Sequence, residues 1–96
     1  MEISKSDIVL SLAGHDKGML FFVSDTDGVY VSLVNGKERK LEHPKRKKVK
    51  HVCLVLRRDS SIATKIRSGD KLLNSELRRE LAIIGQQCNV QTKEGS

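Results

Sequence analysis

The sequence DIVLSLAGHDKGMLFFVSDTDGVYVSLVNG, residues 7–36, has the pattern of three successive β-strands. Its three short apolar runs cover residues 8–13, 19–23 and 29–34. Turn-forming residues follow them, namely Gly14, Asp27-Gly28 and Asn35-Gly36. Short apolar, β-branched runs bounded by Gly, Asn and Asp are typical of strands in a compact sheet. The segment therefore predicts antiparallel strands joined by tight turns.

Asn35-Gly36 is the strongest short hairpin signal in the chain, because a two-residue turn of type I′ requires positive φ at both positions. Residues 37–41 are therefore expected to pair with the strand before the turn. That register sets Leu33 opposite Glu38, so that an apolar residue faces an acid. Either a bulge or a solvent-facing hairpin tip would resolve this conflict.

A further strand is expected over residues 51–56, HVCLVL, which gives about five short strands in the first 56 residues. Closure of such a sheet would remove its exposed edges, so the spacing favours a small antiparallel barrel or sandwich. Phe21 and Phe22 are adjacent on one strand and must point to opposite faces, so at least one is expected in the core.

The second half of the chain predicts two helices. Ser60 or Ser61 can cap the first helix, and Gly69 can end it. Asn74 is a good N-cap for the second helix, and Gly85 is a suitable stop. Three residues of the second helix have the i, i+4, i+7 spacing of an apolar stripe, namely Leu77, Leu81 and Ile84.

These patterns predict one α+β domain. A small antiparallel β-barrel is expected over residues 4–57, and a helical extension over residues 58–85 is expected to pack on it. The polar residues 86–96 are expected to form a flexible tail. A chain of 96 residues fits a single domain of this kind.

Residues 37–50, KERKLEHPKRKKVK, concentrate the positive charge of the chain. They hold eight Lys/Arg and two acids, whereas the first 36 residues hold two Lys and five acids. A block of cations repels itself, and a polyanion such as nucleic acid can neutralise it. Pro44 is expected to break the strand pattern, so that residues 45–50 form an extended loop able to follow a phosphate backbone.

A second informative segment is AGHDKGMLFFV, residues 13–23. Gly14 and Gly18 enclose a polar loop with Lys17 at its apex, and glycines let a backbone come close to a partner. The spacing alone also fits an ordinary hairpin with an exposed lysine. With the flanking strands and the second turn at Asn35-Gly36, the pattern resembles the KOW motif of ribosomal proteins and transcription elongation factors.

The string after the second turn sharpens this resemblance. It is similar to the small bacterial KOW-domain RNA-binding proteins related to the archaeal and eukaryotic large-subunit ribosomal protein fourteen-e. The matching positions are Gly36, Lys37, Arg39, Lys40, Leu41, Glu42, Pro44, Lys45, Lys47, Lys48, Lys50 and His51. Asn35 stands where that family usually has Asp, and both residues suit the turn. The resemblance covers about residues 7–56 and implies an SH3-like KOW barrel that binds RNA, most often ribosomal RNA.

The RNA-binding residues are predicted from the charge pattern and the resemblance together. Gly14 and Gly18 shape the first loop, and Lys17 contacts the RNA. The cations expected to neutralise phosphates are Lys37, Arg39, Lys40, Lys45, Arg46, Lys47, Lys48 and Lys50. Because the chain has only three aromatic residues, recognition is expected to rest on phosphates and RNA shape rather than on base stacking.

Other classes of function find little support in the sequence. It has no Walker-type loop, no GxGxxG motif and no paired metal-ligand spacing, so neither an enzyme nor a metal or cofactor site is expected. No apolar run approaches the ~20 residues of a membrane span, and the N-terminus lacks a signal-peptide pattern. Cys53 and Cys88 form no CxxC, which favours reduced thiols and a cytoplasmic location.

The expected partner is structured RNA, above all ribosomal RNA, in a ribosome-associated or translation-related role. Ribosomal proteins are further candidate partners, and a monomer is expected. The alternative is a protein-interaction module of the transcription or translation machinery. The run PKRKKVK also resembles a nuclear localisation tract, which is a frequent chance match in basic proteins.

Overall fold

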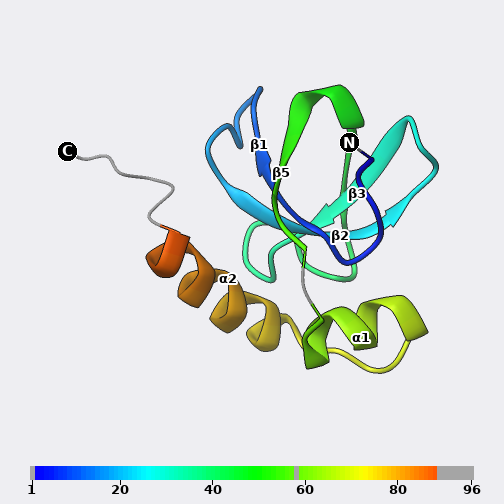
Figure 1. Cartoon of the computed structure of the whole chain (residues 1–96), viewed down its shortest axis with the longest axis vertical. Helices are drawn as coiled ribbons and strands as arrows, with labels where there is room; N and C mark the ends of the chain where they lie inside the picture. Colours follow the sequence, from blue (N-terminus) through cyan, green and yellow to red (C-terminus); the bar gives the residue numbers. More distant parts are fainter. Residues whose placement is uncertain (1, 58, 89–96) are drawn as a thin grey trace.

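The computed structural model describes residues 2–57 and 59–88. These residues form a small α+β domain with one five-stranded antiparallel sheet and two helices, which confirms the predicted fold class at this level (Figure 1). The elements in chain order are β1 (Ile8–Ser11), β2 (Leu20–Thr26), β3 (Tyr30–Val34), β4 (Lys45–Lys48), the short 3-10 helix η1 (Val49–His51), β5 (Val52–Leu56), α1 (Ser61–Ser68) and α2 (Asn74–Cys88).

The strands lie in the order β4-β3-β2-β1-β5, and each neighbouring pair is antiparallel. The strands expected around residues 8–13, 19–23, 29–34 and 51–56 are therefore confirmed. The register shifts in β1 and in β2, and such irregularities increase the local twist and bend of a sheet. Among the described residues, no hydrogen-bonded ladder joins the edge strands β4 and β5, so the sheet is open.

The two faces of the sheet bury different clusters of side chains. Phe21 and Phe22 point to opposite faces, and both are buried. The Phe22 face packs against the two helices, which contribute Ile62, Ile66, Leu77, Leu81 and Ile84. On the Phe21 face, the buried cluster consists of Val9, Phe21, Val23, Val31, Leu33 and Val52. Since none of these buried residues comes from a helix, the sheet itself must curve around the second cluster.

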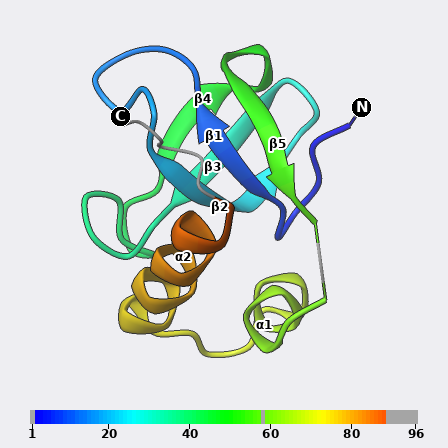
Figure 2. The same cartoon turned by 60° about the vertical axis from the view of Figure 1, so that its left-hand side comes forward.

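Contacts between distant strands show this curvature. Lys47 in the edge strand β4 donates a hydrogen bond to Ser11 Oγ in β1 at 2.9 Å, although β3 and β2 lie between them in the sheet order. The backbone N–H of Val49 donates to Val29 O, and that of Leu12 donates to His51 O, so η1 links the two sides. Figure 2 shows the curved strands on one side of the molecule and the two helices on the other.

The predicted pairing after β3 is wrong. Residues 37–41 form no strand, and β3 pairs instead with β4, which was expected to be part of an extended loop. Leu33 lies opposite Lys45, and Val31 lies opposite Lys47. Alternation along the strand then turns Lys45 and Lys47 toward the Phe21 face, which is the inner face of the curved sheet. Arg46 and Lys48 point to the opposite, outer face.

The Asn35 side chain stabilises the wider loop that replaces the hairpin. Its Oδ1 accepts hydrogen bonds from the backbone N–H groups of Lys37 at 3.0 Å and Arg39 at 2.9 Å. Its Nδ2 donates to Glu38 Oε1 at 3.0 Å. An asparagine that bonds the backbone ahead of it favours such a turn, and it delays the return of the chain until β4.

The two helices follow most of the sequence signals. Ser60 caps α1 by accepting a hydrogen bond from the N–H of Ala63, and Gly69 ends the helix with φ +79°. Leu77, Leu81 and Ile84 are buried, which confirms the predicted apolar stripe of α2.

Two details of α2 differ from the prediction. Asn74 is the first residue of the helix, and its Oδ1 accepts a hydrogen bond from the N–H of Leu41 at 2.8 Å. Gly85 does not end the helix, which continues to Cys88. Residues 86–88 therefore belong to α2, and the rest of the predicted tail lies outside the described residues.

Candidate functional site

The eight cations of residues 37–50 differ in how far the protein itself neutralises them. Lys47 makes a short ion pair with Asp16, and Arg46 lies 3.7 Å from Asp27. The other six make no ion pair with any residue in the described ranges. They are Lys37, Arg39, Lys40, Lys45, Lys48 and Lys50. Most of the predicted phosphate contacts are therefore available to an external anion.

Lys47 is the exception among the predicted RNA-binding residues. Its side chain is only 8% exposed, and its ammonium donates to Ser11 Oγ, to the carbonyl of Ala13 and to Asp16 Oδ1 at 2.9, 2.6 and 2.6 Å. An ammonium has three N–H donors, and all three are occupied. Lys47 therefore holds the first loop against the sheet and has no donor left for a phosphate.

Asp16 is the charged partner of this buried lysine, and its side chain is 13% exposed. Burial alone raises the pKa of a carboxyl group. Hydrogen bonds from Lys47 and Ser11 and the positive charge of Lys47 outweigh that effect, so the pKa of Asp16 lies below its ordinary value. The Asp16 carboxylate therefore stays charged at neutral pH, and its bonds to Lys47 and Ser11 replace the hydration that it loses on burial.

The Lys47 contacts fix the loop between β1 and β2, which carries the other predicted RNA-binding residues. Gly14 and Gly18 both have positive φ, of +85° and +88°, which explains glycine at each end of the loop. The N–H of Gly18 donates to Ser11 O at 2.9 Å and closes the loop. Lys17 is exposed at its apex, as predicted.

The loop between β3 and β4 carries three of the free cations, and α2 holds it in place. Arg78 donates to the carbonyl of Gly36 at 2.6 Å. Asn74 bonds the N–H of Leu41 and donates to Glu42. Gly36 has φ +78°, and a Cβ there would collide with the carbonyl oxygen of Asn74. The loop and the start of α2 therefore fit closely. Arg78 helps to position the loop, a role that the sequence did not indicate.

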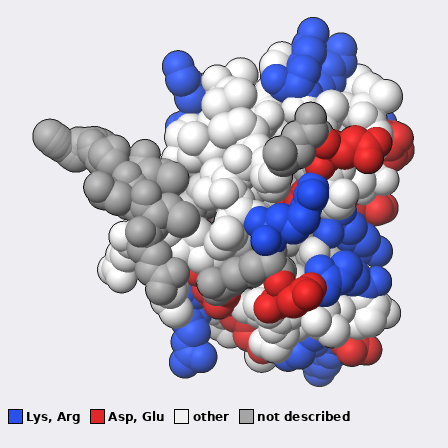
Figure 3. Space-filling model, in the orientation of Figure 1, with Lys and Arg blue, Asp and Glu red and all other residues white. Residues whose placement is uncertain are grey.

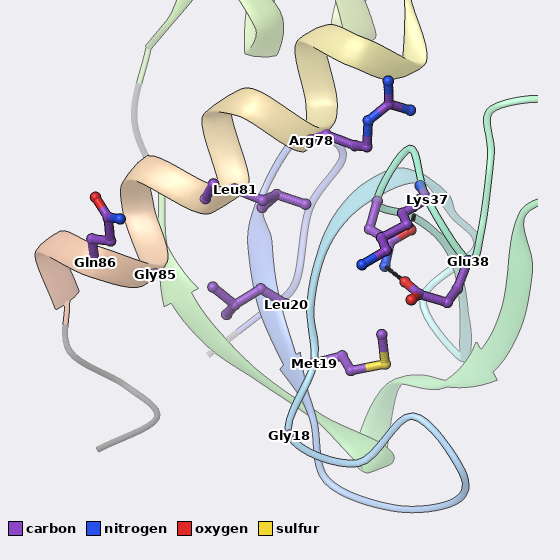
Figure 4. Close-up of a pocket in the computed structure, with 11 residues that line it drawn as sticks. Gly18, Met19, Leu20, Lys37, Glu38, Arg78, Leu81, Gly85 and Gln86 are labelled. Carbon is purple, nitrogen blue, oxygen red and sulfur yellow. Dashed lines mark hydrogen bonds between the residues drawn. The ribbon is translucent and has the colours of Figure 1, made fainter. Parts of the chain in front are cut away.

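A groove runs between α2 and the loops that follow β1 and β3 (Figure 4). Its volume is about 410 Å³, and its apolar lining includes Met19, Leu20 and Leu81. Lys37 and Glu38 lie along one side, while Gln86 lies at the end near the last turn of α2. Gly18 and Lys37 line the same groove. The two basic loops, one with Lys17 and the other with Lys37, Arg39 and Lys40, are therefore neighbours in space.

Two further cations of the segment lie at another part of the sheet. Lys48 and Lys50 line a hollow with Gly28 and Val29, at the turn between β2 and β3. Figure 3 shows Lys and Arg in several separate groups on one face, with acidic side chains between some of them. The positive charge that is continuous in the sequence is thus divided in space, with one part at the two basic loops and another near the β2–β3 turn.

Within the described residues, no group of three or more His, Cys, Asp or Glu side chains could hold a metal ion. Neither α1 nor α2 has the length and apolar character of a membrane-spanning helix. Cys53 in β5 is exposed as a free thiol.

No model of a protein family matches this sequence. A search of curated proteins likewise finds no significant relative. The functional assignment therefore depends on the residues and their geometry.

Proposed function

We propose that this protein binds structured RNA, with ribosomal RNA as the best candidate, and that it catalyses no reaction. The observation that carries the proposal is the set of six cations in residues 37–50 that make no ion pair with any described residue. Lys17 adds a seventh at the apex of a loop that Lys47 holds firmly. Fixed cations of this kind can displace the counterions of a nucleic acid, which is the main source of its affinity for proteins.

We also propose that the curved sheet, although open between β4 and β5, has the SH3-like arrangement of the KOW type. The strand order, the short η1 between β4 and β5, and the Lys47–Ser11 contact across the sheet support this interpretation. The resemblance of the Gly14–Gly18 loop and of residues 36–51 to KOW proteins supports it independently. Such a role is translation-related and would take place in the cytoplasm.

The test compares two triple variants that remove the same charge. Lys45→Ala/Lys48→Ala/Lys50→Ala removes three of the free cations and leaves Lys47 in place. Lys5→Ala/Lys71→Ala/Arg79→Ala removes three exposed cations from other parts of the molecule. Binding of a fluorescent ribosomal RNA hairpin, followed by anisotropy at low salt, is expected to weaken at least about tenfold for the first variant only.

Equal weakening of both variants would show that net charge alone attracts the RNA, and the proposed interface would be wrong. Unchanged binding of the first variant, or no binding by the unmodified protein, would also contradict the proposal. Lys47→Ala is left out of the set because it would disturb the fold.

A protein-interaction role is the second candidate, and the apolar groove beside α2 favours it. The two roles predict different results when the purified protein is examined for bound nucleic acid. Nucleic acid that is lost after nuclease treatment, or in high salt, supports RNA binding. A protein that carries no nucleic acid and binds none in the titration supports the second candidate.

A further inference from the structure

The outer face of β3 and β4 carries an aromatic–arginine stack. Tyr30, Ser32 and Val34 alternate onto this face. Val34 is buried in the cluster that the helices cover, whereas Tyr30 and Ser32 are partly exposed. The guanidinium carbon of Arg46 lies 4.2 Å from the centre of the Tyr30 ring, and the Arg46 side chain is 67% exposed. The ring therefore supports a flat cation whose other face is open to solvent.

The surroundings of this stack differ from those of the other cations. Arg46 shares a hollow of about 130 Å³ with Tyr30, Ser32, Asp25, Thr26 and Asp27. The turn before β3 fixes Asp27, because its Oδ1 accepts hydrogen bonds from the N–H groups of Val29 and Tyr30 at 2.9 and 2.8 Å. These bonds lower the pKa of Asp27, so the carboxylate stays charged.

The negative charges of Asp25 and Asp27 determine which part of an RNA can bind in the hollow. A phosphate would be repelled by Asp25 and Asp27. A base has no charge, it stacks well on a guanidinium plane, and its N–H groups can donate to a carboxylate. Asp27 Oδ1 already accepts two hydrogen bonds and its Oδ2 pairs with Arg46, so Asp25, which accepts one bond from the N–H of Thr26, is the carboxylate with room for a base. Guanine fits best, because its Watson–Crick edge presents two neighbouring N–H donors to the two oxygens of a carboxylate.

We propose that the Tyr30–Arg46 stack binds one unpaired RNA base, with guanine preferred, while the free lysines contact phosphates. The inference rests on the proposed RNA-binding function and adds base recognition to it. It also revises the expectation that recognition involves no base stacking, since one stacking platform is formed by Arg46 and by the only tyrosine of the chain.

The experiment uses two RNA hairpins with the same stem, one fully paired and one with a single bulged guanine. The unmodified protein is expected to bind the bulged hairpin about tenfold more tightly, which corresponds to one stacked base. Arg46→Lys keeps the charge but removes the flat guanidinium, and Tyr30→Leu removes the ring beneath it. Both variants are expected to lose the preference and still bind the paired stem. Arg79→Lys, on the exposed face of α2, is the matched control and should keep the preference.

A second readout reports stacking directly. With 2-aminopurine in the bulge, emission should fall when the unmodified protein or Arg79→Lys binds, and should fall far less with Arg46→Lys. A bulged uracil should bind more weakly than a bulged guanine, because it offers only one N–H donor.

The outcomes separate the two proposals. Equal binding of both hairpins by the unmodified protein, or a preference that survives Arg46→Lys, overturns the base site and leaves RNA binding intact. Equal affinity for guanine and uracil bulges overturns the guanine preference. Failure of the protein to bind either hairpin overturns RNA binding itself.

Discussion

Lys47 and Lys48 are neighbours in β4, yet their side chains have opposite surroundings. Lys47 points to the inner face and uses its three donors on the protein, while Lys48 points outward and is exposed. A run of cations in a sequence does not reveal this difference. Once the run is known to be a strand, alternation places every second cation inward, and Asp16 is the acid that can receive it.

The difference predicts unequal effects of two similar substitutions. Lys47→Met keeps the length of the side chain but leaves Asp16 without its cation, and is expected to lower the free energy of unfolding by about 3 kcal/mol. Lys48→Met removes an exposed charge and is expected to change it by less than about 0.5 kcal/mol. Urea denaturation followed by circular dichroism measures both. Equal stabilities would show that the Lys47 contacts do not hold the curved sheet together.

The loop between β3 and β4 and the first turn of α2 form one structural unit. Gly36, Asn74 and Arg78 join the loop to the helix by hydrogen bonds and close contact. The sequence signals at Asn35-Gly36 and at Asn74 were correctly seen as special, but each was given a local role in a hairpin turn or a helix cap. The partners of Gly36 and Asn74 lie far away in the chain, and local sequence patterns do not indicate such contacts.

Gly36 provides a test of this unit. In Gly36→Ala the new Cβ would meet the carbonyl oxygen of Asn74 and the side chain of Leu77, in a backbone conformation that alanine disfavours. The substitution is expected to cost more than about 2 kcal/mol of stability and to speed amide exchange in the first turn of α2. Gly28→Ala has the same backbone strain but open space around it, so its loss is expected to be only about 1 kcal/mol. Equal losses would indicate that backbone strain alone explains both.

The strands and helices that the sequence predicted correctly are those whose apolar residues face a core. β1, β2, β3 and β5 bury Val9, Phe21, Leu33 and Val52, and the stripe of α2 is buried as well. β4 was missed because its residues are Lys-Arg-Lys-Lys, which carry no apolar signal. Its pairing depends on β3 and on the Lys47 contacts, both of which are tertiary. Gly85 was taken for a helix end because glycine is common there, but it does not have the positive φ that such an end requires.

At the scale of the whole molecule, curvature of the sheet separates charges that are adjacent in the sequence. Some cations lie on the two basic loops, and others lie near the β2–β3 turn, so a bound RNA would have to contact both regions. A folded RNA presents phosphates on more than one side of a compact structure, so it suits the proposed interface.

If free cations of this protein neutralise RNA phosphates, binding must weaken steeply as salt is added. Affinity for a structured RNA should be titrated at several salt concentrations. If on the order of six phosphates are engaged, the slope of log affinity against log salt is expected near −5 for duplex RNA and near −4 for a single strand. The Lys45→Ala/Lys48→Ala/Lys50→Ala variant should show a slope shallower by about 2 to 3. A slope near zero for the unmodified protein would show that its cations do not bind RNA phosphates.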